Sequence, residues 1–365
     1  MKIAYLIQMA DLTTENGISK KIRSQTDRWF GQGNRVRCFA LRPSTDVWAG
    51  LARLECEILC HGHLLQRAIR SYELCNRVRN WQPDVIYFRF GYSSPGLPAL
   101  FREYPTIAEF NSQDLDEYPL TLPKAKLFYH RLTRSRILKS CTAGIAVTRE
   151  IAVYYARDRV RCSTLGNAID LTTIPSLADG NRGAPSIVFI GSKGAPWHGL
   201  DRLAELAHMF PQISFEVIGY DLADWRCTAG LSIPENCNLR GYLTADQYTP
   251  LLAKASVAVG SLALFRNRMD EACPLKVREY LALGLPVIGA YLDTDIPDGA
   301  DYFLRLPNNA KSLAPWRDRI AAFLEHWRGR RVPRSAIAHL DVSVKEAQRL
   351  SFMAETRERF VRDHA

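Results

Sequence analysis

The chain has 365 residues, more than the ~250–300 at which a single hydrophobic core stops growing, so two domains are expected. Its 47% hydrophobic and 24% charged residues are ordinary for a soluble globular protein. The net charge of +10 is uneven, because residues 1–180 carry 25 Lys and Arg against 17 Asp and Glu. This bias suits an anionic acceptor or an anionic membrane surface. General solubility explains it equally well, and charge alone also permits nucleic acid.

Cysteine usage and the first residues point to a reduced, cytoplasmic setting. The nine cysteines are odd in number and scattered, and Met1 leads directly into an apolar, strand-like run. Cys56 and Cys60 have no matching second pair, which argues against a zinc site. No run approaches the ~18–20 apolar residues that span a bilayer.

In the first half, short apolar runs alternate with helical patterns, which is typical of parallel α/β layers. Apolar residues recur at helical spacing over residues 18–29, and Gly31 and Gly33 offer an end to that helix. A second helix, Arg-rich on one side, is predicted over residues 127–138. Strands are predicted over residues 2–8, 35–41, 84–90, 106–110, 143–147 and 162–165.

Pro, Gly, Asp and Asn interrupt the pattern over residues 170–185, which predicts a linker. The alternation then restarts, with a helix over residues 200–209 and a charged amphipathic helix over 342–363. Strands are predicted over residues 186–191, 213–219, 238–241, 257–261, 286–290 and 301–306. The fold class is therefore α/β, with two doubly wound domains over residues 1–180 and 181–342.

The most informative segment contains Glu271 and Glu279, which are separated by seven residues. Pro274 interrupts a continuous helix, so we expect Glu271 in a loop and Glu279 one to two turns inside a helix that begins near Pro274. The N-terminus of such a helix suits a diphosphate. Glu279 can accept hydrogen bonds from a ribose diol and Glu271 from sugar hydroxyls. The alternative is an amphipathic helix with two solvated carboxylates.

This segment resembles the Glu-x7-Glu signature of retaining glycosyltransferases of family 4, which have the GT-B fold. The likeness includes the Pro-Leu-Lys of residues 274–276, the Glu-Tyr-Leu-Ala-Leu-Gly of 279–284 and the Pro-Val-Ile of 286–288. The resemblance implies two Rossmann-like domains that face a cleft, with the last helix, residues 343–365, returning to the first domain. It also implies that Glu271 contacts the donor sugar and Glu279 the donor ribose. Pro274, Leu275 and Lys276 then belong to the donor site.

Residues 189–199 follow a strand and open a helix, the position at which α/β sheets bind phosphate. The resemblance implies a basic pair here that contacts the diphosphate, preceded in this chain by Gly191. Lys193 or Ser192 and His198 stand at these positions. The alternative for Lys193 is a solvated loop residue, and neutral imidazole is a weaker phosphate partner than ammonium, which leaves the role of His198 open. Tyr242 is expected beside the nucleotide base or packed in the core.

In the first domain the resemblance implies a Gly-rich turn near the donor, of which Gly17 remains. Asn16 is expected to replace the second glycine, since Asn tolerates left-handed backbone; Gly17 as a simple turn residue is the alternative. Asn111 occupies a loop in which many relatives carry a His. Glu109 and Asp114 are either structural or acceptor bases. The turn of residues 167–170 is expected to act as a hinge.

The predicted function is transfer of a sugar from a nucleotide-diphosphate sugar to a glycan or polyprenyl-linked acceptor, with retention. Glu271, Lys193 and Asn111 form the predicted catalytic set, and Lys193, helix N-termini and Arg278 are expected to neutralise the leaving diphosphate. No protein nucleophile is recognisable, so front-face attack by the acceptor is expected. No cofactor, metal or nucleic acid is expected. The alternatives are a nucleotide-sugar epimerase of the same fold and a non-catalytic polyanion- or membrane-binding protein.

Overall fold

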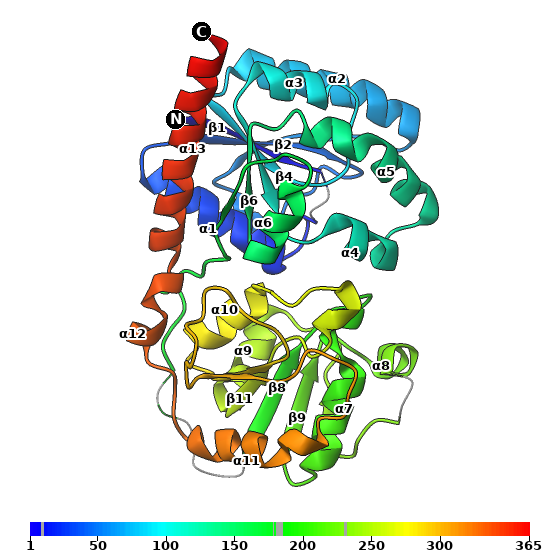
Figure 1. Ribbon diagram of the computed structural model, residues 1–365, viewed down its shortest axis with the longest axis vertical. Helices are drawn as coiled ribbons and strands as arrows, with labels where there is room; N and C mark the ends of the chain where they lie inside the picture. The colour runs from blue at the N-terminus through cyan, green and yellow to red at the C-terminus, as the bar shows by residue number, and fades with distance from the viewer. Residues whose placement is uncertain (9–10, 178, 180–184, 230–231) are drawn as a thin grey trace. The chain divides into compact units, whose positions relative to one another are not determined.

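The chain forms two compact units, each a parallel α/β layer structure (Figure 1). The computed structural model describes residues 1–8, 11–177, 179, 185–229 and 232–365. Unit 1 comprises Met1–Ala168 and Val342–Ala365, and unit 2 comprises Ile169–Asp341. The sequence analysis placed the divisions near residues 180 and 342. Part of its linker, residues 178 and 180–184, lies outside the described residues.

Unit 1 contains a parallel sheet of seven described strands in the order β3-β2-β1-β4-β5-β6-β7. These are β1 (Lys2–Ile7), β2 (Arg35–Arg42), β3 (Glu55–Cys60), β4 (Val85–Arg89), β5 (Thr106–Phe110), β6 (Ala143–Ala146) and β7 (Cys162–Thr164). The central strands are buried on both faces, as expected for a parallel sheet. The chain order reverses between β1 and β4, which makes their carboxyl ends the topological switch point of this unit.

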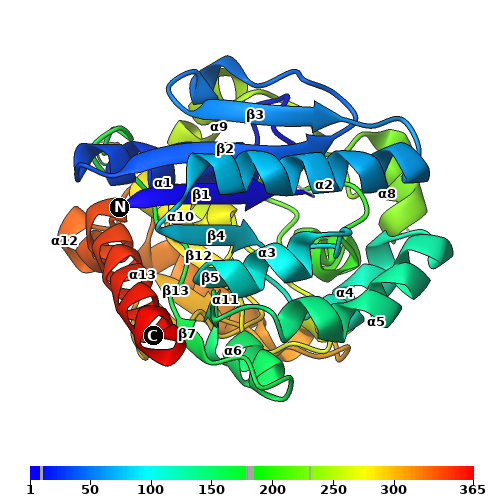
Figure 2. The ribbon, with the colours of Figure 1, turned by 90° about the horizontal axis from the view of Figure 1, so that it is seen from above.

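Helices cover both faces of this sheet (Figure 2). They are α1 (Gly17–Gly31), α2 (Leu64–Trp81), α3 (Leu97–Glu103), α4 (Asp114–Thr121), α5 (Lys124–Leu138), α6 (Arg149–Ala156) and α13 (Val342–His364), with a 3-10 turn at Ala49–Leu51. On one face Tyr5 packs against Trp29 of α1 and Met353 of α13. On the other face Phe88 packs against Phe101 of α3.

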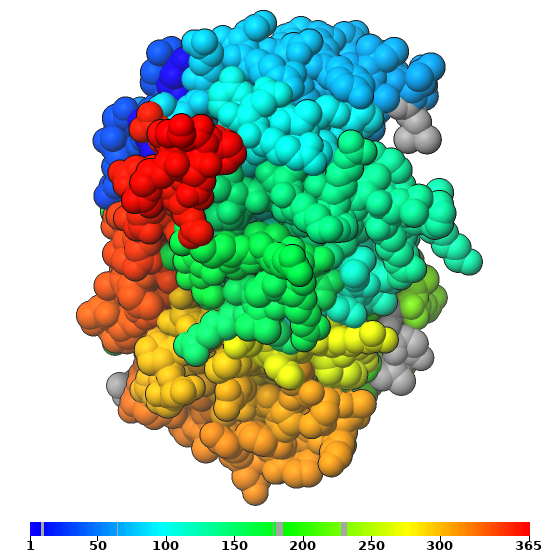
Figure 3. Space-filling view, turned by 45° about the horizontal axis from the view of Figure 1, so that its top comes forward, coloured from blue at the N-terminus to red at the C-terminus, as the bar shows by residue number. Residues whose placement is uncertain are grey.

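The last helix, α13, belongs to unit 1, which confirms the predicted return of the chain end (Figure 3, red). Its buried face carries Glu346, which accepts a 2.8 Å hydrogen bond from the indole of Trp29. Arg349, one turn further, donates to the Tyr87 hydroxyl at 2.7 Å. Polar contacts with two elements of unit 1 therefore fix the register of this helix.

Unit 2 contains a parallel sheet of six described strands in the order β10-β9-β8-β11-β12-β13. These are β8 (Ser186–Ile190), β9 (Ser214–Ile218), β10 (Cys237–Leu239), β11 (Val257–Val259), β12 (Val287–Gly289) and β13 (Phe303–Arg305). The helices are α7 (Leu200–Met209), α8 (Leu222–Ala229), α9 (Ala245–Lys254), α10 (Leu275–Ala282), α11 (Arg317–His326) and α12 (Arg334–Ile337). Short 3-10 turns lie at Pro196–His198, Leu264–Asn267, Ala314–Trp316 and Ala338–Leu340. The switch point of this sheet lies between β8 and β11.

The observed elements confirm the predicted α/β class with two doubly wound sheets. Each predicted strand is present within one or two residues at either end. The analysis missed β3, because Glu55–Cys60 carries two Glu and is half-exposed at the sheet edge, so it lacks a continuous apolar run. In the described ranges, no helix has both the length and the hydrophobicity that a membrane span requires.

Candidate functional site

The loop after β8 is held against the strand beside it by close packing at Gly191. A Cβ atom on Gly191 would lie 2.3 Å from the Tyr220 ring. The backbone N–H of Gly191 donates to the carbonyl of Ile218 at 2.9 Å. A Cβ atom on Gly219, whose φ is +94°, would lie 2.1 Å from the Gly191 carbonyl oxygen. The glycines therefore let the carboxyl ends of β8 and β9 converge, next to the switch point between β8 and β11.

His198 braces this loop from inside. Its Nδ1 accepts a hydrogen bond from the backbone N–H of Ser192 at 3.3 Å and lies 2.9 Å from the Tyr220 hydroxyl, which donates to the Ser192 carbonyl at 2.6 Å. Burial lowers the pKa of His198 well below its usual 6.5, and the charge of Lys276 lowers it further. The ring is therefore neutral, with its proton on Nε2, and adds no charge for a phosphate.

Lys193 lies on the exposed side of the same loop. Its ammonium is 2.9 Å from Asp224 and 3.8 Å from Asp221, at the start of α8. The hydrogen bond to Asp224 and the two carboxylates raise the pKa of Lys193 above 10.5. An exposed pair of this kind is weak because water and salt screen it, so a diphosphate could displace the carboxylates.

Lys276, the second residue of α10, brings a cation to the end of β8. Its ammonium donates to the Ile190 carbonyl at 2.9 Å and lies 4.3 Å from the centroid of the Phe189 ring. Among the residues that the structure describes, no carboxylate pairs with it. Burial lowers its pKa from 10.5 to about 7. A buried lysine with a lowered pKa and no carboxylate partner is expected where the anionic partner is a bound ligand.

The helix that carries Lys276 begins as predicted, with Pro274 as its extended N-cap residue and Leu275 as its first helical residue. Glu279 is half-buried on this helix and accepts a 2.8 Å hydrogen bond from the Tyr248 hydroxyl of α9. Glu271 lies in the preceding loop, as expected. It forms an isolated β-bridge with Leu292. Lys276 and Glu279 are three residues apart, so they share one face of α10.

Arg278 does not have the predicted role, because it is fully buried and already surrounded by acidic groups. Its guanidinium forms a two-bond pair with Asp293 at 2.7 and 2.8 Å and reaches Asp295 at 3.2 Å. It also contacts the Cys273 sulfur at 2.7 Å. Burial works against its charge, but the pairs with these residues raise its pKa well above the usual range of an arginine. Arg278 therefore joins α10 to the loop after β12 and is not available to a diphosphate.

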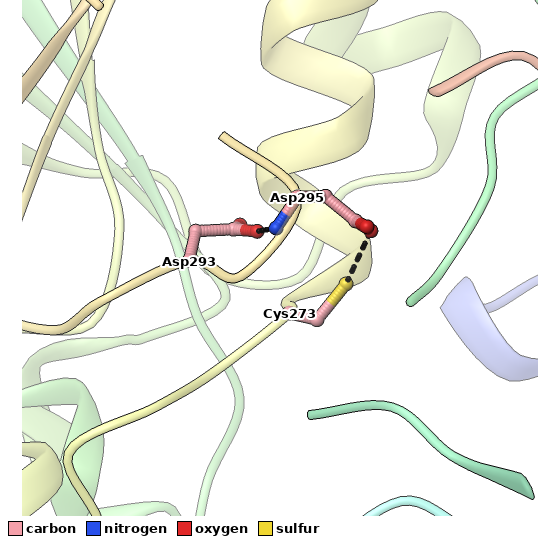
Figure 4. Close-up of side chains that lie close together, drawn as sticks. All are labelled: Cys273, Asp293 and Asp295. Carbon is pink, nitrogen blue, oxygen red and sulfur yellow. Dashed lines mark hydrogen bonds between the residues drawn. The ribbon is translucent and has the colours of Figure 1, made fainter. Parts of the chain in front are cut away.

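The three groups around Arg278 have ligand atoms close enough together to suggest a metal site (Figure 4). Cys273 lies in the loop before α10, and Asp293 and Asp295 lie in the loop after β12. The Cys273 thiol donates to Asp295 at 3.7 Å. Since the guanidinium of Arg278 bonds to all three, this cluster already contains its cation.

Asn16 has a different local role from the one expected, whereas the predicted place of Gly17 in the donor site stays a prediction. Asn16 is extended, with φ −146°, so it does not replace a left-handed glycine. Its side chain caps α1 by accepting from the N–H groups of Ile18 and Ser19, and Ser19 bonds back to the Asn16 N–H. Gly17 is the first residue of the helix. Residues 9–10 of the preceding loop lie outside the described residues.

Asn111 is held within a buried ionic cluster at the end of β5. Its amide oxygen accepts from the Lys21 ammonium at 3.1 Å, and its amide nitrogen lies 3.4 Å from Glu109. Glu109 pairs with Lys21 at 2.8 Å and Arg89 at 3.0 Å. Burial raises the pKa of Glu109, but these cations and Arg349 lower it far more. Glu109 therefore stays ionised in a structural role, and the neutral Asn111 amide cannot act as a general base.

Asp114, like Glu109, already has hydrogen-bond and ion-pair partners within unit 1. It pairs with Arg134 at 2.7 Å, lies 2.5 Å from His130 and accepts from the Tyr155 hydroxyl at 2.9 Å. Burial raises its pKa, but the hydrogen bonds of His130 and Arg134 hold it below the usual 3.8. The sequence left two roles open for Glu109 and Asp114, structural residue or acceptor base. Both residues have the structural role.

Tyr242 lies just after β10, with 71% of its surface exposed. It is not part of the core, which leaves the predicted place beside a nucleotide base open to it. The sequence analysis did not identify Tyr248 or Tyr220, and neither belongs to a recognisable motif. Only the folded chain brings these hydroxyls to Glu279 and to the loop after β8.

Solved structures of glycosyltransferases match the whole chain. One is the lipopolysaccharide outer core galactosyltransferase WaaB in its apo form, with a TM-score of 0.64, 11% identity and coverage of 100% of both chains. Another is HepE of Anabaena in complex with UDP and glucose, with a TM-score of 0.66, 15% identity and coverage of 97% of this chain and 100% of that one. A putative UDP-N-acetylglucosamine 2-epimerase from Listeria monocytogenes is less similar, with a TM-score of 0.57, 11% identity and coverage of 98% and 97%.

At these identities the likeness establishes the fold, which is GT-B as predicted. No protein-family model matches the chain. No curated protein matches it in sequence either.

Proposed function

We propose that the protein is a retaining glycosyltransferase of family 4 that uses a nucleotide-diphosphate sugar. The observation that carries this proposal is the pair Lys276 and Glu279 on one face of α10. Lys276 presents a cation without a carboxylate partner at the end of β8, the sheet edge at which nucleotides bind. Glu279 presents an acceptor-only group about one turn away on the same face, which can receive hydrogen bonds from a ribose diol.

In this proposal Lys276 neutralises the diphosphate, with Lys193 as a second, exposed cation. Glu279 holds the ribose, and Glu271 holds hydroxyls of the donor sugar. The bond between the anomeric carbon and the diphosphate oxygen breaks as the acceptor oxygen attacks from the same face, and the acceptor proton passes to the leaving phosphate. Stabilisation of the leaving group is then the main catalytic contribution.

HepE was solved with UDP and glucose, and WaaB is described as a galactosyltransferase of lipopolysaccharide outer core. These neighbours make a UDP-sugar donor and a glycan or lipid-linked acceptor the first to test. Unit 1, with its positive charge, is proposed to bind the acceptor. A metal ion at the diphosphate is not expected, because Lys276 and Lys193 supply positive charge.

The test is a thermal-shift screen of the protein against a panel of nucleotide sugars. A ligand at 100 times its dissociation constant stabilises the folded state by ~2.7 kcal/mol. We expect one nucleotide class to raise the melting temperature, with the shift reduced in Lys276→Met. No shift with any member of the panel would contradict the proposal.

The epimerase remains a second candidate because an epimerase is among the matching structures. Incubation of the protein with its donor in the absence of any acceptor distinguishes the two reactions. An epimerase converts the sugar nucleotide under these conditions, whereas a transferase leaves it unchanged apart from slow hydrolysis.

A further inference from the structure

A second polar cluster lies at the switch point of unit 1, between the carboxyl ends of β1 and β4. It comprises Gln8, Arg67, Tyr92 and Ser94, and we call it the Arg67 cluster. The guanidinium of Arg67 donates to the Ser94 hydroxyl at 3.3 Å and to the Gln8 amide oxygen at 3.5 Å. Ser94 also donates to the same Gln8 oxygen, at 3.2 Å.

Two buried polar groups in this cluster have no hydrogen-bond partner among the described residues. These are the amide nitrogen of Gln8 and the hydroxyl of Tyr92, whose residues are 9% and 6% exposed. The orientation of the Gln8 amide follows from Arg67, which only donates, so the nitrogen is the unpaired end. A buried polar group without a partner destabilises the fold, so each such group calls for an explanation.

Arg67 is half-buried, yet no carboxylate of the described residues pairs with it. Burial lowers the pKa of Arg67, and only the phenols of Tyr129 and Tyr92 act in the opposite direction. The guanidinium lies 5.6 Å from the centroid of the Tyr92 ring. Its hydrogen-bond acceptors, the Gln8 amide oxygen and the Ser94 hydroxyl, are both neutral, so this partly desolvated cation lacks the anionic partner that such a group normally requires.

The neighbouring charges are also positive. Burial lowers the pKa of His61, which follows β3, and the charges of Arg67 and Lys126 lower it further. The group missing from this site therefore has negative charge and several acceptor oxygens. A phosphate anion can pair with Arg67, and its oxygens can accept from Gln8 and Tyr92.

We propose that the Arg67 cluster binds a phosphoryl group, and that this group belongs to the acceptor. The second half of the proposal rests on the proposed function, whereas phosphate binding itself does not. In an open parallel sheet the switch point is the expected place for such a ligand. The predicted preference for an anionic acceptor thereby acquires a specific site in unit 1.

The test is a titration of inorganic phosphate, followed by calorimetry, in a Lys276→Met background that removes the cation of the donor site. Arg67→Met is expected to weaken phosphate binding about ten- to hundredfold, since hydrogen bonds between charged groups are lost. Arg70→Met is the matched control, because Arg70 lies one turn along α2 and already pairs with Glu73 at 2.5 Å. It should leave the affinity unchanged.

Gln8→Glu provides a variant that remains folded. The new carboxylate pairs with Arg67, so we expect phosphate binding to disappear while the melting temperature rises. Phosphate affinity that is absent in the starting protein, or indifferent to both Arg67→Met and Gln8→Glu, would overturn the proposal.

The source of the phosphoryl group is identified by a second arm with vesicles. Arg67-dependent binding to phosphatidic acid in phosphatidylcholine vesicles indicates a lipid phosphate. Binding of glucose 6-phosphate without vesicle binding indicates a soluble phosphorylated acceptor. A nucleotide-sugar thermal shift run in Arg67→Met, with Lys276 intact, separates the two proposals, because only the donor site of unit 2 then carries its cation.

Discussion

At the residue scale, Arg278 shows how the donor helix is held in place. Its buried guanidinium joins α10 to the loop after β12 through Asp293 and Asp295. Removing one partner of a buried pair leaves an uncompensated charge, which costs far more than the pair itself contributes. The residue beside Glu279 is therefore a positioning residue for the site.

Arg278→Met is expected to destabilise the protein by about 3–5 kcal/mol in urea unfolding. Arg240→Met is the control, since Arg240 forms an exposed pair with Glu216 and should cost at most ~1 kcal/mol. Equal effects of the two substitutions would contradict the buried role of Arg278. Because the guanidinium already occupies the cluster, we also expect EDTA to leave the melting temperature unchanged.

Lys276 makes donor binding depend on pH. In the ligand-free protein its pKa is about 7 because of burial. A diphosphate favours the charged form and raises this pKa, so binding takes up a proton above pH 7. Donor affinity should therefore fall between pH 7 and 9. In the same range the stability of the ligand-free protein should rise, because unfolded Lys, with a pKa near 10.4, binds the proton that the folded state lacks.

Calorimetry at pH 8 in two buffers of different ionisation enthalpy measures this proton uptake directly. Lys276→Arg keeps its charge throughout this range and should abolish both the uptake and the pH dependence. Proton uptake that persists in Lys276→Arg would assign the effect to another group.

At the scale of elements, α13 completes the core of unit 1 through a buried ionic network. Glu346 accepts from Trp29 and from Arg349, and Arg349 in turn reaches Tyr87 and Glu109. Helix packing and the polar network therefore both depend on a segment at the end of the chain.

Glu346→Ala leaves Arg349 and the Trp29 indole without their acceptor, and we expect a loss of about 3–5 kcal/mol in thermal or urea unfolding. Arg357→Met, on the same helix, breaks only the half-exposed pair with Asp84 and should cost at most ~1 kcal/mol. If Glu346→Ala is as mild as the control, the network does not stabilise the docking of α13.

Much of the fold could be predicted because its signals are local. Apolar runs mark the strands, and Pro274 marks the start of α10 within one residue. The edge strand β3 was not predicted because it is half-exposed and lacks a continuous apolar run. The motif also predicted that Glu271 lies in a loop and Glu279 within the helix that follows, and the structure has them there. It could not reveal that Arg278 is buried while Lys276 reaches β8, since both depend on which face of α10 packs inward. The cap formed by Asn16 was misread because Asn suits both left-handed turns and helix N-caps.

At the scale of the whole molecule, the positive charge of residues 1–180 is only partly available to a partner. Arg134, one of the cations on α5, pairs with Asp114 and Asp158 and faces inward. The exposed side of the same helix carries Arg131 together with Phe128 and Leu132, which are 65% and 68% exposed. Exposed apolar residues beside cations are typical of a membrane-facing helix.

We expect the protein to sediment with anionic vesicles and to be released as salt rises and the Debye length falls from ~10 Å at 0.1 M toward ~3 Å at 1 M. Replacing Phe128 and Leu132 together by Ser should weaken this binding at least about tenfold, given ~1.5–3 kcal/mol for each fully buried side chain. Val361→Ser, at an exposed position of α13, is the control. Binding that is absent, or unaffected by salt, would exclude the membrane contact.

The measurement that tests the central claim most directly is a calorimetric titration of the donor identified by the panel into the wild type, Glu279→Gln and Glu216→Gln. Glu279 is proposed to hold the ribose, which is unchanged through the reaction, so its loss should weaken donor binding about ten- to hundredfold. Glu216, an acid of β9 that pairs with Arg240, should be replaceable without effect. Equal donor affinity in all three proteins would contradict the proposed site on α10, and with it the assignment of the protein as a glycosyltransferase.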